Sequence, residues 1–175
     1  MTAGILSAMA TNQRSNGRIT EGALLDDTNR RLLEELQDNA RLSLAELGRR
    51  VGLSAPAVAE RLQRLEHDGV IAGYHAQVEP AAVGFPLGAV IRIRPAPGQL
   101  QNVAELARET PEVVECHRIT GEDCFFIRAY LRDVQHLEEV IDRFVVLGQT
   151  TTSILQSSPV PRRNLALHPA PALTA

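Results

Sequence analysis

Three short runs in the first half of the chain carry apolar residues at helical spacing. Each run is only two or three helical turns long, and each keeps its apolar residues on one side. The pattern therefore predicts three short helices packed around one small core. The positions expected to be buried are Leu32, Leu33 and Leu36 in the first helix, Leu44, Leu47 and Val51 in the second, and Val58, Leu62 and Leu65 in the third.

Start and stop signals bracket the same three runs. Asp26 is suited to cap the first helix, and Ser43 with Glu46 three residues later forms a capping box for the second. Gly52 is expected to end the second helix, and Pro56 lies in the first turn of the third, where its missing N–H is harmless. The third helix is expected to end at Asp68-Gly69.

The second half of the chain alternates between strand-like and helix-like patterns. The order strand, helix, strand, strand, helix, strand is the split ferredoxin-like motif. A turn at Gly121 separates the second and third strands, and Asp133 is expected to cap the second helix. The predicted strands are 89–94, 113–120, 124–132 and 150–157; the first helix carries Leu100, Val103, Leu106 and Ala107, and the second carries Val134, Leu137, Ile141, Phe144 and Val145.

These patterns divide the chain into two domains of an α+β protein. A three-helix, winged-helix-like helix-turn-helix domain is expected at 23–71, and a ferredoxin-like βαββαβ domain at 88–158. The connection between them, 72–87, is predicted to be a linker strand. Residues 1–22 are predicted to be a disordered arm, and residues 159–175 a tail rich in Pro and Ala.

The four-residue turn 51–54 joins two short helices, which is the layout of a DNA-binding helix-turn-helix. The segment 41–64 contains five Arg and two acidic residues, so it is locally +3 in a chain of net charge −3. The alternative is a packing module whose arginines form a solvated surface. Arg61 has its own alternative, an ion pair with an acid such as Asp38. The candidate DNA-binding residues are Ser43, Arg49, Arg50, Ser54, Ala55, Pro56, Ala57, Glu60, Arg61 and Arg64.

Composition argues against other classes of function. The chain has no Lys, which excludes Schiff-base and P-loop chemistry, and no nucleophile–base pair can be assembled, so we expect no enzyme and no cofactor. The five His are scattered, which predicts no metal site. Aromatic residues make up 3%, too few for an RNA-stacking platform. Two Cys without a disulfide framework, and no run of about 20 apolar residues, predict a cytoplasmic protein without a membrane partner. Together with the predicted DNA binding, this implies a nucleoid-associated protein.

A longer set of residues resembles the leucine-responsive/asparagine-operon regulator (Lrp/AsnC) family. The resemblance extends through the second domain to about Arg163. It implies a homodimer that binds double-stranded DNA and assembles further, often to an octamer. The matching residues in the first domain are Leu25-Asp26, Leu33, Leu36, Asn39-Ala40-Arg41, Ser43, Glu46-Leu47, Val51-Gly52-Leu53-Ser54, Val58, Arg61, Leu65-Glu66, Gly69-Val70-Ile71 and Gly73-Tyr74.

The resemblance also implies an amino-acid effector held between dimers. The matching positions are the turn Gly121, Glu122, Asp123 and Cys124 and the strand start Thr150, Thr151, Thr152 and Ser153. Many relatives have an acid where Cys124 stands, so Asp123 or Glu122 is the candidate for the ammonium group. Thr150 and Thr152 share one face of a strand, so we expect them to act together. The alternatives are ordinary hairpin and strand chemistry, and a DNA-coating protein without effector control.

Overall fold

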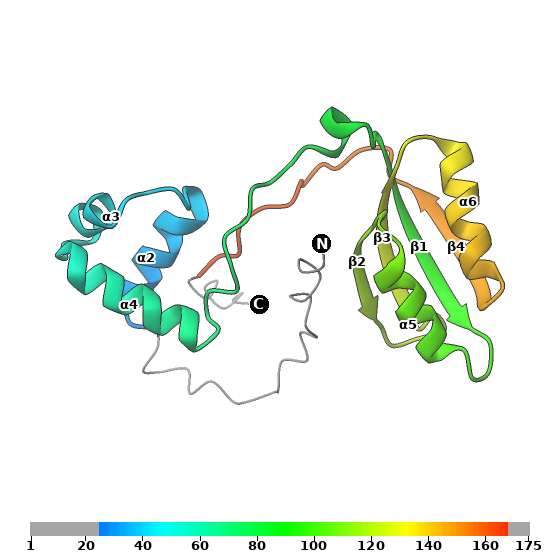
Figure 1. The fold of residues 1–175 in the computed structure, drawn as a ribbon, viewed down its shortest axis with the longest axis horizontal. Helices are drawn as coiled ribbons and strands as arrows, with labels where there is room; N and C mark the ends of the chain where they lie inside the picture. Colours follow the sequence, from blue (N-terminus) through cyan, green and yellow to red (C-terminus); the bar gives the residue numbers. More distant parts are fainter. Residues whose placement is uncertain (1–24, 168–175) are drawn as a thin grey trace, which may run out of the picture. The chain divides into compact units, whose positions relative to one another are not determined.

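The computed structural model describes residues 25–167 and divides them into two compact units. One unit contains residues 25–74 together with 164–167, and the other contains residues 75–163. Both are drawn in Figure 1. The arm predicted at 1–22 and the last eight residues of the predicted tail lie outside the described residues.

Three helices form the first unit, as the apolar spacing predicted. They are α2 (Asp27–Asp38), α3 (Leu44–Val51) and α4 (Ala55–His67). The side chains of Asp26, Ser43 and Ser54 cap them by accepting hydrogen bonds from backbone N–H groups three residues further on. Between residues 25 and 74 the structure has no strand, so helices are the only regular secondary structure of this stretch.

The core of this unit contains eight of the nine predicted side chains. The exception is Leu44, which is 41% exposed because it is the first residue of α3 and lies beyond the reach of the other helices. Gly48 is buried in the middle of α3, and a Cβ atom there would lie 2.4 Å from the carbonyl oxygen of Leu53. The backbone of the turn therefore packs directly against α3 at Gly48.

The segment 164–167 completes the first unit after the chain has passed through the second. Asn164 donates a hydrogen bond to the carbonyl oxygen of Gln37 (2.9 Å), and Arg30 donates one to the carbonyl oxygen of Leu167 (2.7 Å). The Leu167 side chain packs against the core cluster of the helices. We call this segment the C-terminal strap. The sequence predicted only a tail here.

The second unit has the predicted βαββαβ order. Its elements are β1 (Leu87–Pro95), α5 (Leu100–Glu109), β2 (Val113–Arg118), β3 (Phe125–Leu131), α6 (Val134–Val145) and β4 (Gly148–Ile154). The strands pair antiparallel in the order β2-β3-β1-β4, and both helices lie on one face of the sheet (Figure 1). No helix in residues 25–167 is long and apolar enough to cross a membrane.

The connection predicted as a strand at 72–87 is irregular, and this prediction is wrong. Its only regular element in the structure is the short 3-10 helix η1 (Pro80–Val83), and β1 begins at Leu87. Pro80 fixes its own φ and lacks an N–H, and Gly84 has a φ of 92°. Neither residue suits a regular strand.

The sheet has one face covered by the helices and one open face (Figure 1). Ile91 and Ile93 of β1 are fully buried under the helices, as are Phe125 and Ile127 of β3. The open face carries the intervening residues Val90, Arg92, Arg94, Phe126, Arg128 and Tyr130. In α6, Leu137 and Phe144 are buried as expected, whereas Val134 and Val145, at the helix ends, are 55% and 50% exposed.

Candidate nucleic-acid interface and effector turn

The turn between α3 and α4 has the geometry that a helix-turn-helix requires. Gly52 caps α3 with a φ of 75°, a left-handed conformation that favours glycine. Ser54 then caps α4, and Ala55, Pro56 and Ala57 form its first turn. These three side chains are small and uncharged, so the leading end of α4 can approach the floor of a DNA groove closely.

The outward face of α4 presents a pair of opposite charges. Arg64 donates a hydrogen bond to Glu60 at 2.7 Å, one helical turn closer to the N-terminus. The two side chains are 61% and 72% exposed. Val58, Leu62 and Leu65 occupy the opposite side of the helix and are buried, as predicted. An exposed Arg on this face can reach guanine in the major groove.

The arginines of α3 are bound to acidic side chains. Glu46 pairs with both Arg49 and Arg50, and Arg50 also reaches Glu35 of α2 at 2.6 Å. The hydrogen bonds from Arg50 and Arg49 hold the pKa of Glu46 below its ordinary value. Arg49 remains 76% exposed, so it can exchange this partner for a DNA phosphate.

Arg61 points toward α2 and not outward. It donates hydrogen bonds to Asp26 (2.7 Å) and Asn29 (2.9 Å). This agrees with the alternative that Arg61 pairs with an acid, although the partner is Asp26 and not Asp38. The Arg61 guanidinium holds the pKa of the Asp26 carboxyl below its ordinary value. The pair joins the start of α2 to the middle of α4.

In the second unit, both acids of the turn 121–124 are paired with arginines of β1. Glu122 lies 2.6 Å from Arg94, whose Nε also donates to the Glu122 carbonyl oxygen, and Asp123 lies 3.6 Å from Arg92. Gly121 has a φ of 114°, which favours glycine. Arg92 and Arg94 were not among the residues predicted for this site; their alternation with apolar residues along β1 was the available signal.

Cys124 belongs to the sheet more than to the exposed turn. Its N–H donates to the carbonyl oxygen of Ile93 (2.9 Å), its own carbonyl accepts from Ile119 (3.0 Å), and its side chain packs against the core. It is a free thiol, as is Cys116, which lies opposite Ile127 in the ladder.

The residues of β4 are divided between the two faces of the sheet. Residues directly opposite each other on neighbouring strands share a face. Thr150 and Thr152 therefore share a face as predicted, but it is the face that the helices cover, while Thr151 and Ser153 lie on the open face. The opposite residues in β1 are Ile93 for Thr150, Arg92 for Thr151, Ile91 for Thr152 and Val90 for Ser153.

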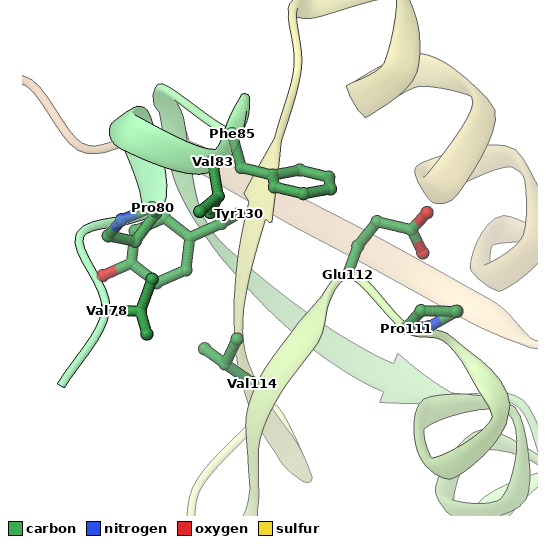
Figure 2. Close-up of a pocket in the computed structure, with 8 residues that line it drawn as sticks. All are labelled: Val78, Pro80, Val83, Phe85, Pro111, Glu112, Val114 and Tyr130. Carbon is green, nitrogen blue, oxygen red and sulfur yellow. The ribbon is translucent and has the colours of Figure 1, made fainter. Parts of the chain in front are cut away.

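An apolar pocket of about 290 Å³ lies at the other end of the open face (Figure 2). Tyr130 and Val114 line it from the sheet, η1 and its flanking residues line it from another side, and Pro111 and Glu112, just before β2, complete it. The carboxylate of Glu112, at the rim, is held by His136 (2.9 Å) and Arg143 (3.3 Å). The lining residues are Val78, Pro80, Val83, Phe85, Pro111, Glu112, Val114 and Tyr130.

A helix-turn-helix unit joined to an open-faced βαββαβ unit defines a two-domain DNA-binding regulator. The model of the AsnC-type helix-turn-helix domain matches residues 25–66, and that of the Lrp/AsnC ligand binding domain matches residues 88–165. The chain belongs to the Lrp/AsnC family of DNA-binding transcriptional regulators, which are not enzymes.

Individual relatives agree with this assignment. YezC, an HTH-type transcriptional regulator of Bacillus subtilis, is 38% identical over 77% of this chain and 95% of its own length. The feast or famine regulatory protein Rv3291c of M. tuberculosis, solved in complex with L-methionine, is 33% identical with a TM-score of 0.76, over 81% of this chain and 98% of that one. NMB0573 of Neisseria meningitidis, also solved with L-methionine, is 28% identical with a TM-score of 0.74, over 79% and 94%.

Proposed function

We propose that this protein is a sequence-specific transcriptional regulator whose assembly and DNA affinity respond to a small amino acid. The observation that carries the DNA-reading part is the outward face of α4, where Arg64 is exposed beyond a first turn of small residues. In this proposal Arg64 contacts base edges. Arg49, Arg50 and the capped start of α3 at Ser43 contact phosphates.

Selection from a random duplex library tests this part. The full chain is expected to enrich a pseudo-palindrome whose half-sites lie about one helical turn apart, or a multiple of that. Footprinting on the enriched DNA should then protect both half-sites. Failure to enrich any sequence above background would contradict sequence-specific regulation. The place of action, in this proposal, is the nucleoid in the cytoplasm.

The effector part is supported by the chemistry of the turn 121–124 and its neighbours. An amino acid presents an ammonium and a carboxylate, and the turn places Asp123 and Glu122 next to Arg92 and Arg94. The ligand can exchange partners with these ion pairs, its ammonium binding a carboxylate and its carboxylate a guanidinium. Thr151, opposite Arg92, adds a hydroxyl on the same face. The L-methionine complexes of two relatives support the choice of ligand class.

A thermal-shift screen of the twenty amino acids, followed by calorimetry, tests the effector. A ligand that binds the native state must raise the melting temperature. Asp123→Ala with Thr151→Val is expected to abolish ligand binding, and Asp123→Ala with Thr152→Val tests the hydroxyl on the other face. Unchanged affinity in both double variants would show that the site lies elsewhere. No response to any amino acid would favour the DNA-coating alternative.

We also propose a homodimer as the minimum unit, which associates further to an octamer. The open face supports this, because Tyr130 lines an apolar pocket there, Phe126 is a second half-buried aromatic side chain on the same face, and the buried Nε of Arg128 has no hydrogen-bond partner in the described residues. A second copy can cover this face. Tyr130→Asp is expected to shift sedimentation toward the monomer. A monomer at micromolar concentration, with and without DNA, would contradict the proposal.

A further inference from the structure

We infer that Glu60 is a specificity-determining residue of the DNA interface: it positions Arg64 for base reading and lowers the affinity for random DNA. The inference rests on the proposed role of α4 as the recognition helix. Glu60 places a carboxylate on a surface that must approach polyanionic DNA. The α4 helix has two acids, and the other one, Glu66, accepts a hydrogen bond from Tyr74 away from this face.

A contribution to helix stability does not explain why an acidic residue is present at position 60. The side chains of Glu60 and Arg64 are 72% and 61% exposed, and such exposed pairs on a helix contribute little. A carboxylate on the DNA-facing surface also opposes the phosphate attraction that supplies essentially all of the affinity for random DNA. The residue therefore has an electrostatic cost at the interface and little structural benefit.

The contact with Arg64 supplies the benefit. A free Arg side chain has many rotamers and can bind any phosphate, which carries no sequence information. Glu60 holds one terminal nitrogen of Arg64 at 2.7 Å along the outward face of α4. The remaining N–H groups of the planar guanidinium stay free for a bidentate contact with guanine. Where no guanine is in place to bind Arg64, the Glu60 carboxylate still repels the DNA phosphates. It therefore lowers the affinity for random DNA.

Three variants of the full chain separate these two effects. Glu60→Gln removes the charge and weakens the pairing, Glu60→Asp keeps the charge but is too short to hold Arg64, and Arg64→Ala removes the reader. Asp27→Asn, an exposed acid in the first turn of α2, is the control for loss of one negative charge. Each variant is put through random-library selection, and its affinity for random duplex is measured as a function of salt.

Glu60→Gln and Glu60→Asp are expected to lose base preference at the same positions as Arg64→Ala, and combining Glu60→Gln with Arg64→Ala is expected to add no further loss at those positions. Only Glu60→Gln should bind random DNA more tightly, by roughly three-fold or more at low salt. If the parent enriches a sequence and both Glu60 variants enrich the same one with equal preference, the inference is overturned. If the parent enriches nothing, the proposed function itself fails.

Discussion

At the scale of single residues, the arginines of the DNA-binding unit illustrate what a sequence can predict. The sequence made Arg64 a candidate for DNA contact, which its exposure on the outward face of α4 allows, and left two roles open for Arg61. In the structure Arg61 donates hydrogen bonds to Asp26 and Asn29. Sequence could not name Asp26, because the pair joins residues 35 positions apart whose proximity depends on how α2 crosses α4.

The Asp26–Arg61 pair predicts a pH-dependent stability. Because Arg61 holds the pKa of Asp26 below its ordinary value of 3.8, the pair stabilises the fold above that value. The stabilisation is lost as the pH falls through the lowered pKa. Asp26→Asn keeps a helix-capping side chain and removes the charge. Its melting temperature should lie below that of the parent at pH 7, and the difference should disappear in acid. A difference that stays constant down to acid pH would contradict this mechanism.

Arg64→Ala is expected to weaken binding to the selected DNA by roughly 1–3 kcal/mol and to reduce the preference over random duplex. Arg49→Ala, on α3, should weaken binding to both DNAs equally and lower the salt slope by about 1. Fluorescence anisotropy on the two duplexes over a salt series measures both effects. Arg64→Ala with unchanged selectivity would remove Arg64 from the base-reading residues.

At the scale of elements, the sequence predicted the interiors of helices and strands better than their ends. Leu44 and Val134 fit the apolar stripes, yet each begins its helix, where no neighbouring element covers it. Gly48, in contrast, lies inside a helix, and the sequence did not predict why a glycine is needed there. Glycine weakens a helix interior, and no local signal explains it. The structure explains the glycine: the carbonyl oxygen of Leu53 occupies the space that a side chain at position 48 would need.

Gly48→Ala should therefore destabilise the first unit, by about 1–3 kcal/mol, although Ala is the better helix former. A Cβ atom would force the α3–α4 turn open. Gly52 is the matched comparison, since its surroundings are open and only its φ of 75° favours glycine. Asn tolerates that conformation, so Gly52→Asn should be mild and Gly48→Asn severe. Denaturant unfolding followed by circular dichroism compares them; equal losses would contradict the steric explanation.

At the scale of the whole molecule, local patterns predicted two domains and the order of the helices and strands in each. They did not predict the strap, because Leu165 and Leu167 look alike in a Pro- and Ala-rich tail. Only the packing on the helices distinguishes them: Leu165 is 76% exposed, and Leu167 joins a core that begins at Leu25.

Leu167→Ala is expected to lower the free energy of unfolding of the helical unit by about 1 kcal/mol, since a half-buried Leu loses part of its apolar burial. Leu165→Ala should change it by less than about 0.5 kcal/mol. The unfolding of the sheet unit is the internal reference and should not move. Equal effects of the two substitutions would show that the strap contributes no packing energy.

The strap also affects the order in which a newly made chain matures. Domains usually fold as they leave the ribosome, the N-terminal one first, at about 5–20 residues per second. Residues 25–74 are made early, but Asn164 and Leu167, which complete their packing, follow only after the whole second unit. The interval is roughly 5–20 seconds. The DNA-binding unit therefore reaches its full stability last, so an interrupted translation product carries a weakened DNA-binding unit.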